Sequence, residues 1–287
     1  GQTFKRTQRS VRAAMEKAKK DKSRPVLIVQ FDVPKGQQET GRGSDFDLEV
    51  FLVDDGSTDG TAEALAKEFP SVTVIHGDGN YFWARGMSVA DTAAARTQPY
   101  AYLWLNDDTR LYEDAVARLM AVVRAHPGAI AVGATRASDV EEITYGGRRR
   151  LGPHPLRLGP LLTPRTMLEC DTFEGNAVLV PAAVREVVGP IDGAYPHAYA
   201  DTDYGLRARG QGIHILQIPG FVGVCDVGPR VKQRMSLPRA WADLNSPKGL
   251  PWRAQMKFLR RHGDWRWPWW FATGQVSQLS RRVGWTR

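Results

Sequence analysis

Three short acidic clusters contain the residues of this chain that are best suited to chemistry. They are Asp54-Asp55, Asp107-Asp108 and Asp201-Asp203, and each lies at the end of an apolar run or at an expected helix start. Carboxylates can bind a divalent cation, and one carboxylate can also remove a proton from an attacking hydroxyl group. The clusters therefore suggest a site for a metal-bound, phosphorylated donor.

Alternating strands and helices are expected to position the first two clusters. Residues 48–53 read as a strand that ends at Asp54, followed by a turn and a helix over 61–69. The next unit has a strand over 72–75, a helix over 83–95, and a strand over 101–105 that leads into Asp107-Asp108. This alternation predicts a mostly parallel, Rossmann-like α/β sheet flanked by helices, with ligands bound beyond the carboxyl ends of its strands.

The rest of the chain is predicted with the same patterns. Four prolines argue for an irregular segment over 148–164, and an amphipathic helix is expected within the first 24 residues. The strand at 26–31 has no assigned place in the sheet, and residues 35–45 read as a surface loop. Other elements are expected at residues 112–125 (helix), 129–133 (strand), 177–180 (strand), 182–188 (helix) and 204–210 (helix).

Each acidic cluster also has a purely structural interpretation. Asp108 or Thr109 could cap the helix that begins near residue 112, and Asp54-Asp55 could serve only as a turn. Asp201 and Asp203 could likewise cap the helix that follows them, paired with nearby arginines. The functional interpretation is favoured because three such clusters occur together.

Composition indicates a globular protein with an uneven distribution of charge. The 287 residues are 42% hydrophobic and carry a net charge of +8. Residues 230–287 contain 13 Lys and Arg against two Asp, so the remainder is slightly acidic. A basic extension of this kind predicts an anionic partner, although a solvated basic face is the simpler alternative.

The cysteines and the hydropathy pattern limit the class of protein. Cys170 and Cys225 are the two cysteines and show no metal-ligand spacing, so neither a disulfide framework nor a zinc site is indicated. No apolar run approaches the length of a membrane-spanning helix, and no secretory pattern opens the chain. A cytoplasmic location is expected.

The motifs together resemble family 2 glycosyltransferases of bacterial type, which have the GT-A fold. The resemblance extends from about Phe46 to about Val224. It rests on four stretches: 53–61 (VDDGSTDGT), 104–109 (WLNDDT), 175–176 (GN) and 200–204 (ADTDY), with 79–87 (GNYFWARGM) as a further similarity.

The resemblance implies roles for the acidic residues. Asp54 and Asp55 are expected to contact the nucleotide base or ribose, Asp107 the ribose, and Asp108 a Mn²⁺ or Mg²⁺ ion that bridges the diphosphate. Asp201 is expected to be the catalytic base. Because the family often has Glu-Asp where this chain has Ala200-Asp201, Asp203 remains the alternative base.

The resemblance also implies further binding residues and shows one departure. Arg85, Thr3 and Arg6 are assigned to nucleotide binding, and Gly175, Asn176 and Trp83 to acceptor binding. Family members open with an apolar strand that leads into a short motif. In this chain residues 3–6 resemble only the end of that motif, and the apolar strand before it has no counterpart. Either the chain is truncated or residues 26–31 supply a substitute strand.

The extension adds six tryptophans among its basic residues. Aromatic and basic residues together suit a membrane interface, which predicts a peripheral association with the inner face of the membrane. Two alternatives are stacking on single-stranded nucleic acid and packing of the aromatics against the domain. Since no nucleic-acid-binding motif is present, a nucleic acid partner is not expected. The tryptophans are Trp252, Trp265, Trp267, Trp269, Trp270 and Trp285.

The predicted function follows from this organisation. A GT-A domain over residues 1–229, with a basic, helical extension expected over 230–287, would be an inverting, metal-dependent hexosyl- or deoxyhexosyltransferase. Its donor would be a UDP- or dTDP-sugar in preference to a GDP-sugar, and its acceptor a glycan or lipid-linked hydroxyl in surface polysaccharide or glycolipid synthesis. The alternative is a non-catalytic, membrane-associated binding protein on a degenerate transferase fold. A nucleotidyltransferase is disfavoured because residues 41–43 are a weak phosphate loop.

Overall fold

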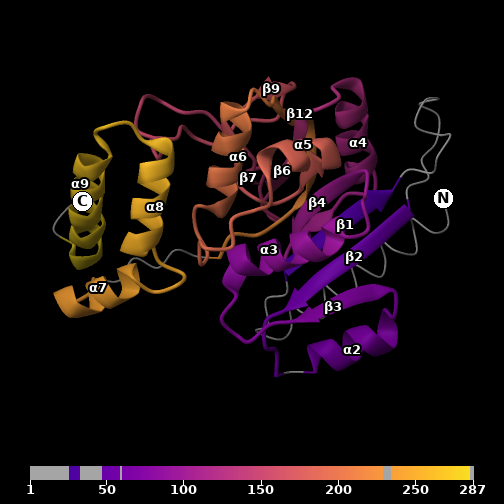
Figure 1. Ribbon diagram of the computed structural model, residues 1–287, viewed down its shortest axis with the longest axis horizontal. Coiled ribbons are helices and arrows are strands. Elements are labelled where there is room, and N and C mark those ends of the chain that lie inside the picture. The colour runs from indigo at the N-terminus through magenta and orange to yellow at the C-terminus, as the bar shows by residue number, and fades with distance from the viewer. Residues whose placement is uncertain (1–25, 33–46, 59, 229–233, 285–287) are drawn as a thin grey trace.

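A computed structural model describes residues 26–32, 47–58, 60–228 and 234–284 of the chain. In this part of the protein a central sheet is covered by helices, and three C-terminal helices lie side by side at one end of the molecule (Figure 1). Thr3, Arg6, the helix expected within residues 1–24 and the loop expected at 35–45 lie outside the described residues.

The main sheet has the strand order β3-β2-β1-β4-β11-β6-β12-β5, and β7 and β9 pair at its side. β2 and β3 are parallel, β12 and β6 are parallel, and β4 runs antiparallel to both β1 and β11. β1 is also antiparallel to β2, and β11 to β6, so five strands, β3, β2, β4, β6 and β12, point in one direction. Because β1 and β11 are inserted antiparallel between them, β2–β3 and β6–β12 are the parallel pairs of the described strands, and the sheet is mixed. The strands are β1 (Val26–Asp32), β2 (Asp47–Asp54), β3 (Val72–His76), β4 (Ala101–Asn106), β5 (Arg110–Leu111), β6 (Ile130–Arg136), β7 (Ile143–Tyr145), β8 (Gly147–Arg148), β9 (Leu168–Glu169), β10 (Thr172–Phe173), β11 (Val178–Pro181) and β12 (Ile215–Val224).

The strand whose place was open in the sequence, β1, lies between β2 and β4. Val26 pairs with Val53 on one side and with Asn106 on the other. β1 runs antiparallel to both neighbours, so β2 and β4 end level with each other at one edge of the sheet. The first two acidic clusters follow these two strand ends.

Helices cover both faces of the sheet. Residues along β4 alternate between two buried clusters, with Tyr102 and Trp104 facing one cluster and Leu103 and Leu105 facing the other. Burial on both faces explains why these strands are apolar without a polar alternation. The helices are α2 (Thr61–Glu68), α3 (Phe82–Ala95), α4 (Ala115–Ala125), α5 (Ala182–Val188), α6 (Ala200–Gly210), α7 (Leu237–Leu244), α8 (Trp252–His262) and α9 (Trp267–Val283).

Two helices begin three or more residues away from their predicted starts. α4 begins at Ala115 because Arg110–Leu111 pairs with β12 instead, and Tyr112 N donates to Val222 O at 2.8 Å. α6 begins at Ala200, so Asp201 and Asp203 lie in its first turn rather than before it. For α4 the cause is a strand pairing with a distant segment, which the local sequence does not encode.

The C-terminal extension is helical, as expected. Both cysteines are free and buried. None of the helices in the described part of the chain is long and apolar enough to cross a membrane.

Candidate active site

The turn after β2 is built around two carboxylates with different partners. Asp54 is buried and accepts hydrogen bonds from Ser57, one from the backbone N–H at 3.1 Å and one from the hydroxyl group. Its own carbonyl oxygen accepts the N–H of Gly77 at 2.8 Å, which ties the turn to the end of β3. Asp54 therefore shapes this edge of the sheet.

Asp55 holds the loop that leads into α3. Its Oδ1 accepts the N–H of Gly79 at 2.9 Å, and its Oδ2 accepts those of Tyr81 at 2.9 Å and Phe82 at 3.0 Å. A Cβ atom on Gly77 would lie 2.5 Å from Oδ1, so glycine is required for this close approach. A carboxylate at a helix start is also stabilised by the helix dipole. Asp55 thus organises the loop with both of its oxygens.

Arg85 is an exposed residue of α3 beside this loop. Its guanidinium carbon lies 4.4 Å from the ring centroid of Tyr81, a cation–π contact. Since Asp55 fixes the backbone of Tyr81, it also fixes the platform on which Arg85 rests. The first cluster and Arg85 therefore form one connected unit.

The turn after β4 is clamped by Asn176. This fully buried side chain accepts the backbone N–H of Asn106 at 3.3 Å and the hydroxyl of Thr109 at 2.8 Å through its Oδ1. Trp83 donates its indole N–H to Oδ1 of Asn106 at 2.8 Å. Asn176 and Trp83 thus support the turn that carries Asp107 and Asp108. The sequence predicted acceptor binding for these two residues and did not predict this structural role.

Gly175 connects this turn to the third acidic cluster. Its N–H donates to Oδ2 of Asp201 at 3.0 Å. A Cβ at this position would lie 2.5 Å from the Trp83 ring and 3.1 Å from Cβ of Asp201, so the backbone passes between the two side chains. Two neighbouring residues, Gly175 and Asn176, therefore hold the second and third clusters close together.

Asp201 and Asp203 have opposite electrostatic environments. Asp201 is half-buried and accepts the N–H of Thr202 at 2.7 Å in addition to that of Gly175. Burial raises the pKa of Asp201, and these backbone hydrogen bonds offset only part of that rise. Asp201 therefore holds a proton more readily than an exposed aspartate does.

Asp203 is fully buried in a cluster of positive groups. It accepts hydrogen bonds from Arg207 at 2.8 Å, Arg261 at 2.9 Å, His262 at 2.8 Å and the hydroxyl of Tyr195 at 3.2 Å. Burial alone would raise the pKa of Asp203, but the hydrogen bonds and the charge of Arg207 outweigh it and lower that pKa below its usual range. Asp203 is therefore ionised at neutral pH and anchors α8 to α6.

The acidic clusters have three further neighbours that the sequence did not single out, namely Cys225, Tyr145 and Glu174. Cys225, at the end of β12, donates its thiol to Oδ1 of Asp108 at 3.2 Å. Burial raises the pKa of Tyr145, and the nearby Cys225, Asp108, Glu174 and Asp201 add to the effect. Tyr145 is therefore close enough to Asp108 and Asp201 to respond to the charge of both.

No local sequence signal identifies Tyr145 or Cys225. Glu174 directly precedes Gly175-Asn176 and could have been found by its position alone. It accepts two hydrogen bonds from Arg148, at 2.9 and 2.7 Å, which hold its carboxylate.

Asp108 is the residue expected to hold a divalent cation. Within the described residues no group of three or more His, Cys, Asp or Glu side chains could hold a metal ion. The Cys225 contact is the one hydrogen bond to Asp108 from the described part of the chain, which leaves its second oxygen for another ligand. Mg²⁺ is often held by one or two carboxylates together with substrate phosphates, so this set fits a metal that arrives with a diphosphate.

A comparison of sequence families identifies the class of protein. Residues 37–179 match the family described as "Glycosyl transferase family 2". The chain therefore carries a domain of glycosyl transferase family 2, and the α/β sheet with its flanking helices is of the GT-A type. Both expectations from the sequence are confirmed.

Solved structures with a similar arrangement of elements have low sequence identity. One is titled "Crystal structure of GalNAc-T7 with UDP, GalNAc and Mn2+"; it is 13% identical with a TM-score of 0.49, and the match covers 82% of this chain and 52% of that one. Another is residues 1–349 of TarS from S. aureus, at 14% identity and a TM-score of 0.45, covering 82% of this chain and 69% of that one. The chain thus spans about half the length of the GalNAc-T7 chain, at 52%. No curated protein sequence matches it.

Proposed function

We propose that this protein transfers a sugar from a nucleoside-diphosphate donor to a hydroxyl acceptor with inversion at the anomeric carbon. One observation carries the proposal: Gly175 holds Asp201 while its neighbour Asn176 holds the turn of Asp107 and Asp108. A reaction of this kind needs a base for the acceptor close to a group that stabilises the leaving diphosphate. Family membership supplies the reaction type.

The nucleotide would bind along the edge formed by the ends of β2 and β4. Asp54 and Asp55 shape this edge, and Asp107, beside Asn106, contacts the ribose. Arg85 is exposed next to the loop that Asp55 organises and is positioned to meet the nucleotide. We assign these four residues to donor binding.

Asp108 would hold Mn²⁺ or Mg²⁺ together with the donor diphosphate. Such a cation, when bound, stabilises negative charge on the leaving diphosphate. The thiol of Cys225 fixes one carboxylate oxygen of Asp108 and so orients the other. Tyr145 lies close enough to this carboxylate for the charge of Asp108 to contribute to its raised pKa, so we place its hydroxyl group in the same part of the site.

Asp201 is proposed as the catalytic base. Its oxygens accept hydrogen bonds from Gly175 and Thr202, which fix its orientation. A pKa raised by burial brings a carboxylate closer to the operating pH, where a general base works best. Asp203 is assigned a positioning role, because its oxygens already accept hydrogen bonds from Arg207, Arg261 and His262.

In the proposed step, Asp201 removes the proton of the acceptor hydroxyl as its oxygen attacks the anomeric carbon. The new bond between that oxygen and carbon forms as the bond from the anomeric carbon to the phosphate oxygen breaks. The electron pair leaves with the nucleoside diphosphate, and the proton remains on Asp201. Attack from the side opposite the diphosphate inverts the configuration.

The finer substrate assignments follow the family resemblance. We propose a UDP- or dTDP-hexose or deoxyhexose as the donor, and a glycan or lipid-linked hydroxyl as the acceptor in surface polysaccharide or glycolipid synthesis. Trp83 and Gly175 lie beside Asp201 and would form part of the wall that the acceptor meets.

Calorimetric titration of UDP, dTDP and GDP, with and without Mn²⁺, tests the donor site. We expect metal-dependent binding of one nucleotide that is lost in Asp108→Asn and kept in Asp139→Asn, an exposed control. Transfer is then tested as release of that nucleotide from its sugar donors with a panel of hydroxyl acceptors. Failure of the wild-type protein to bind any nucleotide, or metal-independent binding unaffected by Asp108→Asn, would overturn the proposal.

A further inference from the structure

The C-terminal helices are held in a fixed orientation on the domain. Phe258 of α8 packs against Tyr199 with ring centroids 5.2 Å apart, next to the hydrogen bonds of Asp203 with Arg261 and His262. Asp192 adds two ion pairs with α8, to Lys257 at 2.6 Å and to Arg261 at 2.8 Å. These contacts are buried or half-buried, so the surface of α8 and α9 has a defined direction relative to Asp201.

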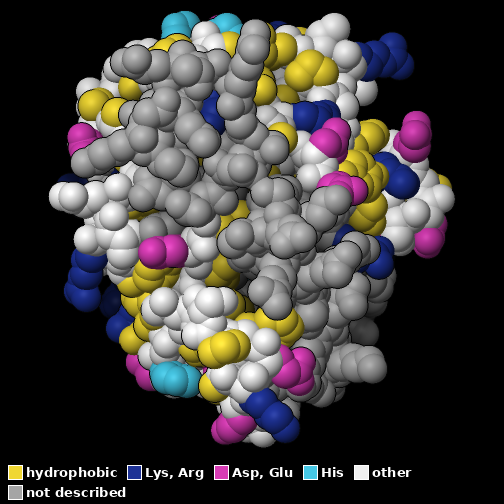
Figure 2. Space-filling view, turned by 90° about the vertical axis from the view of Figure 1, so that its right-hand side faces the viewer, with side chains coloured by type: hydrophobic (Ala, Val, Ile, Leu, Met, Phe, Trp, Pro, Cys, Tyr) yellow, Lys and Arg dark blue, Asp and Glu magenta, His cyan; other side chains and the backbone are white. Residues whose placement is uncertain are grey.

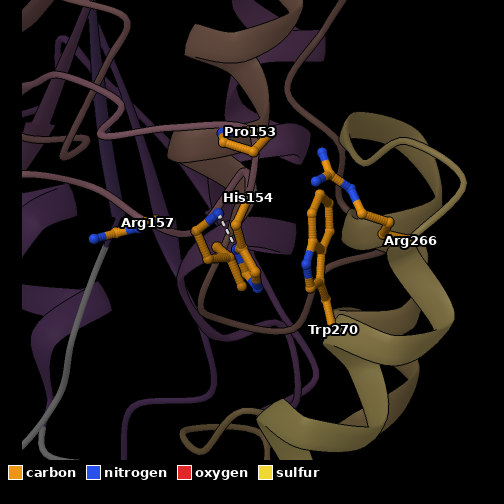
Figure 3. Close-up of a pocket in the computed structure, with 6 residues that line it drawn as sticks. Pro153, His154, Arg157, Arg266 and Trp270 are labelled. Carbon is orange, nitrogen blue, oxygen red and sulfur yellow. Dashed lines mark hydrogen bonds between the residues drawn. The ribbon is translucent and has the colours of Figure 1, made fainter.

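A second contact holds α9. Trp270 lies between His154 of the proline-rich segment and Arg266 (Figure 3). The ring centroids of His154 and Trp270 are 4.7 Å apart, and the guanidinium carbon of Arg266 lies 5.0 Å from the centroid of the Trp270 ring. A pocket of about 500 Å³ opens beside this stack. Its lining residues are Pro153, His154, Leu156, Arg157, Arg266 and Trp270.

Three large apolar side chains in and next to α9 are mostly exposed to solvent. The exposed fractions are 85% for Trp265, 70% for Trp269 and 64% for Val276. Trp269 and Val276 are seven residues apart and so share one face of α9, while α9 lies at the outer end of the molecule beyond α8 (Figure 1). Exposed tryptophans beside basic residues are suited to the interface between a membrane and water.

Basic side chains accompany these tryptophans. Residues 234–284 contain ten Lys and Arg against Asp243 and Asp264, and both aspartates are paired, with Arg282 and Arg266. Within the described part of the chain, no acidic partner reaches Arg253 or Arg260, which are exposed on α8 and lie 5.2 and 5.8 Å from the ring centroids of Trp252 and Trp267. On the opposite side of the molecule, the coloured positive and negative side chains are interspersed (Figure 2).

We infer that Trp265, Trp269, Val276, Arg253 and Arg260 form a membrane-binding surface that docks on an anionic phospholipid bilayer. Tryptophan favours the headgroup region of a bilayer, and each Lys or Arg near an anionic surface increases affinity about fivefold. The net charge of the extension complements anionic lipid headgroups. This inference does not depend on sugar transfer, because the surface consists of residues outside the candidate active site.

Vesicle flotation tests the inference with the full-length protein. We expect binding to vesicles of phosphatidylcholine with phosphatidylglycerol, and much weaker binding to phosphatidylcholine alone. Arg253→Gln with Arg260→Gln should lower the partition coefficient about 30-fold. Trp265→Ser with Trp269→Ser should also lower it, whereas Val187→Ser, an exposed apolar control on α5, should not.

Three results would overturn the inference. The first is wild-type protein that does not float with anionic vesicles, and the second is tryptophan variants that float as well as the wild type. The third is a wild-type protein that does not bind vesicles but forms a dimer or an oligonucleotide complex, where the tryptophan substitutions abolish that dimer or complex. Quenching of tryptophan fluorescence by brominated lipid, lost in Trp265→Ser with Trp269→Ser, would support insertion independently of flotation.

Discussion

Asp203, which is fully buried, forms an ion pair at 2.9 Å with the partly exposed Arg261, 58 positions later in the chain. Asp203 lies in the first turn of α6, two residues after Asp201, and Arg261 lies in the last turn of α8. This pair therefore links the C-terminal helices to the part of α6 that carries the proposed base.

We predict that Asp203→Asn destabilises the protein strongly. The substitution leaves the guanidinium groups of Arg207 and Arg261 beside a neutral, fully buried side chain. Removal of one partner of a buried ion pair costs about 3 to 5 kcal/mol. The free energy of unfolding in urea should fall by this order, whereas Asp264→Asn, which breaks the exposed pair with Arg266, should change it little. An unchanged midpoint for Asp203→Asn would contradict the assigned anchor role.

The same anchor predicts how stability depends on pH. A carboxylate whose folded-state pKa is lowered contributes stability that is present above its unfolded pKa of about 3.9. That contribution is lost as the pH falls below this value toward the folded pKa. The free energy difference between wild type and Asp203→Asn should therefore be constant from pH 7 to about 5 and shrink below about 4. A difference that remained constant down to pH 3 would argue against an ionised Asp203.

Asp201→Asn is predicted to remove catalysis while nucleotide binding is retained. General base catalysis contributes about 10²- to 10⁴-fold, so kcat should fall by this factor. Because burial raises the pKa of Asp201, the wild-type rate should rise with pH through a value above that of an exposed aspartate. The measurement is a pH profile of initial rates with calorimetry of the nucleotide in parallel. Full activity in the variant would exclude Asp201 as the base.

Gly175→Ala tests whether the close packing of Gly175 against Trp83 and Asp201 matters for the reaction. The new methyl group would lie 2.5 Å from the indole ring and 3.1 Å from Cβ of Asp201, so one of the two side chains must move. We expect kcat to fall at least tenfold, because small displacements of catalytic groups cost about 10²-fold. Gly210→Ala is the matched control on α6, where nothing lies within 4 Å of the added carbon. Equal activity of the two variants would show that the packing is not required.

Asp55→Ala should weaken nucleotide binding through the loop before α3. It removes the acceptor of three backbone N–H groups, from Gly79, Tyr81 and Phe82. The loop and the platform under Arg85 then lose their fixed position. The dissociation constant of the bound nucleotide should increase about 10- to 100-fold, since each lost hydrogen bond to a charged group costs about 1.5 to 3 kcal/mol, partly recovered from water. Asp78→Asn, an exposed residue of the same loop, is the control for this titration.

Strands β1–β4, β6 and β11, helices α2–α6 and the acidic turns could be predicted from the sequence because their signals are local. β12 and the short strands were not predicted. Apolar runs that end at Asp54 and near Asp108 predict two strands, and each acidic turn lies within a few residues of its strand. The family motifs occur in the same order along the chain. The helix at residues 112–125 was predicted three residues too early, since pairing of Arg110–Leu111 with β12 involves a segment over 100 residues away.

Only the tertiary structure decided how the candidate site is divided among its residues. The sequence left Asp201 and Asp203 as alternative bases, and the contacts of Arg261 and His262 with Asp203 distinguish their environments. The thiol of Cys225 reaches Asp108 across 117 positions, and Asn176 reaches Asn106 across 70. Hydrogen bonds between such distant residues follow from the packing of whole elements and leave no periodic pattern in the chain. The sequence by itself therefore determined the fold class and the acidic residues, and the packed fold determined what each carboxylate contacts.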